Sequence, residues 1–232
     1  KMNKVAQSLT ISLIQTDTIW ENIDANLVNL SSKIEQIKDA TDMILLPELF
    51  STGFTMEADG VAETMDGKGV RWMLDMAKLR KSLVIGSLLI SESGHFFNRL
   101  LVAFPDGNLK YYDKRHLFSY AGEHKVFKAG KQRLTFHYKG FKICPLICYD
   151  LRFPVWARNT EEIDLILYVA NWPNARMLAW DTLLKARAIE NLCYVVGLNR
   201  VGIDNNQLVY TGHSAVYDAM GSTLLSFEPG KE

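Results

Sequence analysis

The stretch "KICPLICYDLRFPVWARN", residues 142–159, changes character near its middle. Its first seven residues, KICPLIC, form a short apolar run that predicts a buried β-strand. A polar and aromatic segment follows, and it contains Pro154, a residue type favoured in the first turn of a helix. We therefore expect Cys148 at a strand-to-helix turn, where free backbone N–H groups and a helix dipole would favour a thiolate.

Three roles are open to Cys148: core residue, metal ligand or nucleophile. Cysteine is among the most buried residue types, so this stretch alone favours the core role. Metal binding is disfavoured because Cys144 and Cys148 have no further cysteine or histidine cluster at zinc-finger spacing. A nucleophile needs a base, and none of the five histidines lies in a context that marks it as one.

The rest of the chain alternates short apolar runs with helical patterns, which predicts an α/β protein. Runs typical of strands cover residues 9–15, 43–47, 83–90, 142–148, 164–170 and 193–199. A first helix is expected to bury Ile23, Leu27, Leu30, Ile34 and Ile37. A second helix is expected to face a sheet with Leu178, Leu183, Ala186 and Ile189.

Two further segments read as consecutive antiparallel strands. Residues 95–114 contain an Asp-Gly hairpin signal at 106–107, and residues 133–148 turn at Lys139 and Gly140. Such meanders combined with βα units predict mixed sheets. No repeat or flexible linker interrupts the chain, so we expect residues 1–232 to form a single domain.

The composition limits the kinds of partner. The 232 residues are 48% hydrophobic and 22% charged with a formal net charge of +0, which gives no electrostatic footprint for nucleic acid or an anionic membrane. The apolar runs are too short to span a bilayer, and the amino-terminal KMNKVAQSLT lacks a signal-peptide core. Three cysteines make a disulfide framework improbable. We expect a cytoplasmic protein that acts on small molecules.

Glu48, Lys114 and Glu123 are the other candidate site residues. Glu48 directly follows a buried apolar run, at the strand end where open α/β sheets bind ligands, and a buried carboxylate can act as a base. Lys114 also lies just past a strand; it could stabilise an oxyanion, with Glu123 holding its ammonium. Taken singly, Glu48 could equally be an exposed loop acid, and Lys114 reads better as a solvated lysine.

Three segments in this order resemble the nitrilase, or carbon-nitrogen hydrolase, superfamily: LLPELFSTGF (45–54), YYDKRHLFSYAGEH (111–124) and ICYDLRFPVWARN (147–159). The similarity continues through VANWPNAR and YTGHSAVYD and covers nearly the whole chain. It implies that Cys148 is the nucleophile, Glu48 the catalytic base, Lys114 the catalytic lysine and Glu123 a supporting glutamate. It also implies an α-β-β-α sandwich, a homodimer built by the helices after the cysteine and near residue 180, and no metal or organic cofactor.

Within the superfamily, the cysteine and lysine segments look most like the omega-amidase branch, which hydrolyses terminal amides such as those of 2-oxoglutaramate and 2-oxosuccinamate. N-carbamoyl-amine hydrolases, aliphatic amidases and nitrilases are rival activities, and a non-catalytic binding protein is a rival of another class. The chain ends at LLSFEPGKE, sooner than most members, so it is either truncated or lacks a carboxy-terminal tail, which places the dimer in question.

Six residues beside the motifs are candidates for substrate binding. Arg152 is either an anchor for a substrate carboxylate or a brace that pairs with Asp150 or Glu161. Five other side chains are expected to wall a small pocket or to pack in the core: Phe54, Phe118, Tyr149, Asn171 and Trp172.

Overall fold

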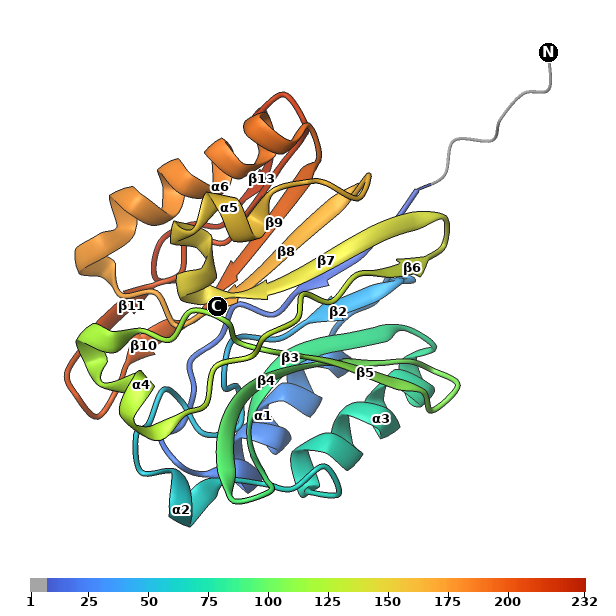
Figure 1. Ribbon diagram of the computed structural model, residues 1–232. Helices are drawn as coiled ribbons and strands as arrows, with labels where there is room; N and C mark the ends of the chain where they lie inside the picture. Colours follow the sequence, from blue (N-terminus) through green and yellow to red (C-terminus); the bar gives the residue numbers. More distant parts are fainter. Residues whose placement is uncertain (1–7) are drawn as a thin grey trace.

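The computed structural model describes residues 8–232, and in it two mixed sheets face each other (Figure 1). The amino-terminal stretch KMNKVAQSLT was predicted to lack a signal-peptide core, and its residues 1–7 lie outside the described part. The first sheet has the order β1-β2-β3-β4-β5. Its strands are β1 (Ile11–Leu13), β2 (Met43–Leu45), β3 (Leu83–Glu92), β4 (His95–Ala103) and β5 (Leu109–Asp113).

The second sheet has the order β13-β12-β9-β8-β7-β6. Its strands are β6 (Phe136–Tyr138), β7 (Phe141–Ile147), β8 (Leu165–Ala170), β9 (Tyr194–Asn199), β12 (Ala215–Tyr217) and β13 (Thr223–Ser226). A separate hairpin joins β10 (Val201–Ile203) to β11 (Val209–Thr211).

Both sheets repeat one pattern, three parallel strands continued by antiparallel ones. β1, β2 and β3 are parallel, and β4 and β5 follow antiparallel. β7, β8 and β9 are likewise parallel, and β6, β12 and β13 pair antiparallel at the two sides. The predicted mixed sheets and both predicted meanders are confirmed.

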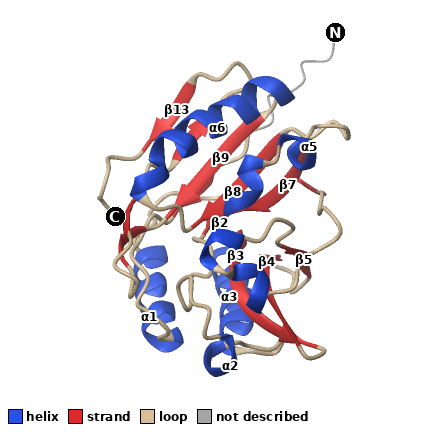
Figure 2. Ribbon diagram, turned by 60° about the vertical axis from the view of Figure 1, so that its left-hand side comes forward, coloured by secondary structure: helices blue, strands red, loops and turns tan. Residues whose placement is uncertain are grey.

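Helices cover the outer face of each sheet, which gives the four layers α-β-β-α (Figures 1 and 2). On the first sheet lie α1 (Ile23–Glu35) and α3 (Lys68–Arg80), and on the second lie α5 (Pro154–Ala157) and α6 (Met177–Asn191). Two short helices, α2 (Ala58–Val61) and α4 (Glu123–Val126), lie in loops. The 3-10 turns are η1 (Ser119–Ala121), η2 (Cys148–Arg152) and η3 (Asn174–Arg176).

The central strands are apolar on both faces because each face is buried. Met43 and Leu45 of β2 point into the core between the sheets, whereas Ile44 between them packs under α1 and α3. This burial on two sides explains the continuous apolar runs in the sequence. The apolar stripe of α1 is confirmed, since Leu27, Leu30 and Ile34 are buried against the same sheet.

The predicted buried face of α6 is confirmed for Leu183, which is partly buried against the core between the sheets, and is wrong for Leu178 and Ile189. Leu178 is 82% exposed and Ile189 is 49% exposed, and the sheet is covered instead by Met177, Trp180, Leu184 and Ala188. The helix carries large apolar residues on two sides, so spacing alone does not show which side packs. Leu178 and Ile189 are therefore left exposed on the outward side of α6, together with Thr182, Lys185 and Glu190.

In residues 8–232, no helix combines the length and apolar composition needed to cross a membrane.

Candidate active site

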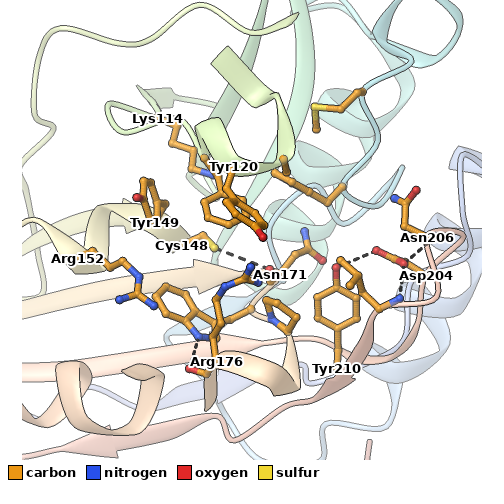
Figure 3. Close-up of a pocket in the computed structure, with 17 residues that line it drawn as sticks. Lys114, Tyr120, Cys148, Tyr149, Arg152, Asn171, Arg176, Asp204, Asn206 and Tyr210 are labelled. Atoms are coloured by element: carbon orange, nitrogen blue, oxygen red, sulfur yellow. Dashed lines mark hydrogen bonds between the residues drawn. The ribbon is translucent and has the colours of Figure 1, made fainter. Parts of the chain in front are cut away.

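A cavity of about 380 Å³ opens where strands of both sheets end (Figure 3). Cys148 and Lys114 lie on its wall, although they come from different sheets. All six residues predicted to contact substrate also line it: Phe54, Phe118, Tyr149, Arg152, Asn171 and Trp172. The structure thus brings together the three sequence segments that the prediction combined.

The ammonium of Lys114 is fully buried between two carboxylates. Its Nζ lies 2.8 Å from Glu48 Oε1 and 3.0 Å from each carboxylate oxygen of Glu123. The side chains of both ion pairs are fully buried. Glu123 is held in turn by the Phe118 N–H, which donates to its Oε2 at 2.5 Å. Three predicted site residues therefore form one hydrogen-bonded unit.

Asn98 of β4 also belongs to this unit, and the sequence reading missed it. Its Nδ2 donates to Glu48 Oε1 at 2.8 Å and to Glu123 Oε1 at 3.3 Å, and its backbone oxygen accepts from the Lys114 N–H. A polar residue inside the apolar run HFFNRLLVAF was the signal that could have identified it, because a buried amide needs partners.

Glu48 is fixed from both sheets. Asn171, which follows β8, donates its backbone N–H to Glu48 Oε2 at 2.7 Å and its side-chain Nδ2 to the Glu48 carbonyl at 2.7 Å. Asn171 was predicted to contact substrate; its amide nitrogen is bound to the glutamate, and its side chain also lines the cavity. Its Oδ1 is buried without a partner among the described residues.

Cys148 occupies a backbone conformation that few side chains adopt. Its φ of +43° lies in the left-handed region, which costs about 1–3 kcal/mol for such residues and is typical of functional turns. The Sγ atom lies 3.9 Å from the carbonyl oxygen of Asn171. The turn directs the thiol toward the cavity, whereas Cys144 of the preceding strand β7 is fully buried in the core, as expected.

Burial controls the charge of these groups. It raises the pKa of the Cys148 thiol well above its usual value; Glu48 adds to the rise and Lys114 opposes it. Burial also raises the pKa of Glu123. The pKa of Lys114 would be lowered by burial, but the charges of Glu123 and Glu48 outweigh this and raise it. Burial therefore favours the neutral thiol and opposes the thiolate expected from a helix dipole, whereas the two glutamates favour the charged form of Lys114.

The brace interpretation of Arg152 is wrong. The carboxylate of Asp150 is occupied by Tyr112 and His116, and that of Glu161 by Arg133 and Lys142. The guanidinium of Arg152 lies 5.1 Å from the Trp172 ring centre, on the cavity wall. It forms no ion pair within residues 8–232.

Arg176 is a second guanidinium in the cavity that the prediction missed. It packs 5.2 Å from the ring centre of Phe118 and 5.3 Å from that of Tyr120, and no carboxylate in the described part of the chain pairs with it. Figure 3 shows it among the residues that line the cavity with Cys148. The segment VANWPNAR, already noted for its similarity to the superfamily, was the available signal.

Asp204 and Tyr210 form the far wall of the cavity, and the tyrosine hydroxyl donates to the carboxylate at 2.9 Å. Across residues 8–232, no group of three or more histidine, cysteine or acidic side chains has a metal-binding arrangement.

Comparisons with known proteins agree with this geometry. The carbon-nitrogen hydrolase family profile matches residues 10–232. An omega-amidase named YafV from Yersinia enterocolitica is 44% identical over 97% of this chain and 87% of its own. A 2-oxoglutaramate amidase from Bacillus subtilis is 34% identical over 96% and 87% of the two chains.

Among solved structures, XC1258 from Xanthomonas campestris superimposes with a TM-score of 0.92 and 46% identity, covering 95% of this chain and 86% of its own. It is described as a CN-hydrolase superfamily protein with an arsenic adduct in the active site. The similarity extends across both sheets and all the segments that build the cavity.

Proposed function

Because the chain belongs to the carbon-nitrogen hydrolase family, we propose that it is an omega-amidase that releases ammonia from small dicarboxylate monoamides such as 2-oxoglutaramate and 2-oxosuccinamate. One observation carries the proposal: a thiol, a carboxylate and a buried ammonium meet at a cavity that also holds two guanidinium groups with no carboxylate partner in residues 8–232. The first three groups suit amide hydrolysis, and the last two suit a substrate with a carboxylate.

In the first half-reaction, the Cys148 sulfur attacks the amide carbon while Glu48 accepts the thiol proton. A C–S bond forms, and the carbonyl oxygen becomes an oxyanion. The Lys114 ammonium and the backbone N–H of Tyr149 stabilise that charge. When the intermediate collapses, the C–N bond breaks, and Glu48 returns the proton to the leaving nitrogen so that ammonia departs.

In the second half-reaction, Glu48 takes a proton from water, which attacks the thioester carbon. The C–S bond breaks, the acid is released, and the proton returns to the Cys148 sulfur. Glu48 therefore acts once as base and once as acid in each half-reaction, which explains why it is held by Lys114, Asn98 and Asn171 rather than left mobile.

Arg176 and Arg152 are the candidates for binding the distal carboxylate. A guanidinium binds a carboxylate through two parallel N–H donors, and neither head group has a carboxylate partner within residues 8–232. The aromatic side chains of Phe54, Phe118 and Trp172 would enclose the short chain between the two substrate ends.

A substrate panel scored by ammonia release tests the proposal. The panel contains 2-oxoglutaramate, 2-oxosuccinamate, glutamine, an N-carbamoyl amino acid, an aliphatic amide and an aliphatic nitrile. We expect the highest kcat/KM for the two 2-oxo monoamides. A higher kcat/KM for the aliphatic amide, which lacks a carboxylate, would contradict the assigned substrate class while leaving the amidase chemistry in place.

We also propose a homodimer that forms through the outer face of α5 and α6. This face exposes apolar side chains that a water-facing helix pair does not need, among them Val155 at 90%, Leu178 at 82% and Leu192 at 72% exposure. Sedimentation of the parent protein should give a dimer at micromolar concentration, and Leu178→Glu should shift it toward monomer. A monomeric parent would contradict the dimer.

A reducing compartment such as the cytoplasm is part of the proposal. The structure has free thiols at Cys144, Cys148 and Cys193, and the proposed nucleophile acts only in its reduced form.

A further inference from the structure

Asp150 lies two residues after Cys148, and its carboxylate is fully buried and accepts four hydrogen bonds. Oδ1 accepts the backbone N–H of His116 at 3.0 Å and its ring Nδ1–H at 2.8 Å. Oδ2 accepts the hydroxyl of Tyr112 at 2.7 Å and the backbone N–H of Ile147 at 3.1 Å. The last bond spans the turn in which Cys148 has its left-handed backbone.

The two side chains that hold this carboxylate flank Lys114 in the sequence. Tyr112 precedes the lysine by two residues, and His116 follows it by two. The Tyr112 oxygen also accepts the Trp156 Nε1–H at 3.0 Å, and the His116 ring stacks on Phe153 with ring centres 3.7 Å apart. The lysine segment of the first sheet is thus attached on both sides of Lys114 to the cysteine segment of the second.

From these contacts we propose that Asp150, Tyr112 and His116 form a clasp that sets the distance between the Lys114 ammonium and the Cys148 thiol. The clasp residues do not touch the reacting atoms, so they are positioning residues. The proposal rests on the proposed amidase function only for its kinetic readout. Its second readout, the reactivity of the free thiol, needs no substrate.

The clasp has a consequence that a purely structural contact would lack. Glu48, Lys114 and Glu123 shift the pKa of the Cys148 thiol, and of these three only Lys114 favours the thiolate; the guanidinium groups of Arg152 and Arg176 line the same cavity. If the clasp loosens, Lys114 moves away from the sulfur. The thiolate then forms at higher pH, and the oxyanion of the reaction loses part of its stabilisation.

His116→Ala and His116→Asn are the decisive pair of variants. Alanine removes the ring donor, whereas the Asn amide nitrogen can reach the place of Nδ1 and donate to Asp150. We expect His116→Ala to lower kcat for 2-oxoglutaramate about tenfold to a hundredfold with little change in KM, the cost of a small misplacement of reacting groups. The pH midpoint of iodoacetamide alkylation at Cys148 should rise, and His116→Asn should restore most of both values.

Tyr112→Phe removes a single hydroxyl and gives a second test if His116→Ala does not fold. His213→Asn is the matched control, because His213 Nδ1 lies 3.2 Å from Asp181 Oδ2 in a histidine–aspartate pair away from the cavity. The control should keep the parent kcat and alkylation midpoint.

The clasp would be overturned if both His116→Ala and Tyr112→Phe kept the kcat and the alkylation midpoint of the parent and differed from it only in a lower unfolding temperature. If the parent itself releases no ammonia from 2-oxoglutaramate, the proposed function fails, and the alkylation midpoints still decide the clasp.

Discussion

The two sheets share a core of three parallel strands extended by antiparallel ones, yet they bring different chemistry to the cavity between them. The loops that follow β2 and β5 in the first sheet supply the charges, Glu48 and Lys114, and Asn98 of β4 joins them. The loops that follow β7 and β8 in the second sheet supply an uncharged thiol and backbone groups, through Cys148 and Asn171.

The two contributions also differ in how they are held. The charged unit is fixed by mutual ion pairs with no exposed surface, so it keeps its geometry without the second sheet's thiol. The thiol is instead fixed by a turn with an unfavourable backbone angle. We infer that reactivity depends on bringing a stable charged unit and a strained nucleophile together, and substitutions on either side can test this.

The largest effect is expected on the nucleophile side, from Cys148→Ala. Loss of the proposed nucleophile should lower kcat by about 10⁴-fold or more, because the remaining groups cannot form a thioester. Cys144→Ala is the matched control, because Cys144 lies four residues earlier, on β7, and is buried in the core. Ammonia release from 2-oxoglutaramate measures both; an active Cys148→Ala protein would remove the nucleophile assignment.

On the charged side, Glu48→Gln should lower kcat by about 10²- to 10⁴-fold, since the amide cannot accept the thiol proton. The protein should stay folded, because the Gln amide keeps the shape of the Glu48 side chain. Glu63→Gln provides the comparison: Glu63 is also a buried glutamate of the first half, and its Oε1 accepts the Gly69 N–H at 2.7 Å, away from the cavity. Equal kcat values for the two variants would disprove the base assignment.

Asn98→Ala should have a smaller effect, a fall in kcat of about tenfold, the loss associated with one hydrogen bond to a charged group. The variant leaves both glutamates paired with Lys114 but removes the amide that joins them. Asn26→Ala removes a buried asparagine that donates to the Ile19 and Ser51 carbonyls. Both variants should be destabilised, and only Asn98→Ala should be slow; slowing of both alike would mean that kcat merely follows stability.

The smallest effect concerns stability, through the core thiol of Cys144. Burial raises the pKa of Cys144 from 9.0 to about 12, so between these values the unfolded chain releases a proton that the folded protein keeps. The stability that this thiol contributes is complete below pH 9 and is lost as the pH rises toward 12. Between pH 9 and 11, the free energy of unfolding measured with urea should fall more steeply for the parent than for Cys144→Ala. The difference in slope should be about 1.4 kcal/mol per pH unit. Parallel slopes would contradict the pKa shift.

Much of the fold and three site residues could be predicted from the sequence, because the periodicity of buried residues and the position of strand ends follow simple rules. Apolar runs identified the strands that are buried on two faces. Glu48, Lys114 and Cys148 became candidates because each lies at or just past the end of a predicted strand. Resemblance to the superfamily then joined three segments that no local pattern connects. These residues meet in the structure because the carboxyl ends of parallel strands share one edge of each sheet.

The failures have equally specific causes. Leu178 and Ile189 were assigned to the buried side of α6 because apolar residues on two sides make spacing ambiguous. Asn98 was missed because a single amide within an apolar strand gains meaning only from partners distant in the sequence. The Arg152 brace failed because Asp150 had already been taken by Tyr112 and His116, a competition that sequence cannot show.

The thioester on Cys148 is the central claim, and mass spectrometry of acid-quenched turnover tests it most directly. Protein mixed with excess 2-oxoglutaramate and quenched within the first turnovers should carry one added 2-oxoglutaryl group, mapped to the peptide that contains Cys148. The Cys144→Ala protein should carry the same adduct, and the Cys148→Ala protein should carry none. Steady ammonia release with no adduct in the parent, or an adduct that persists in Cys148→Ala, would contradict the claim.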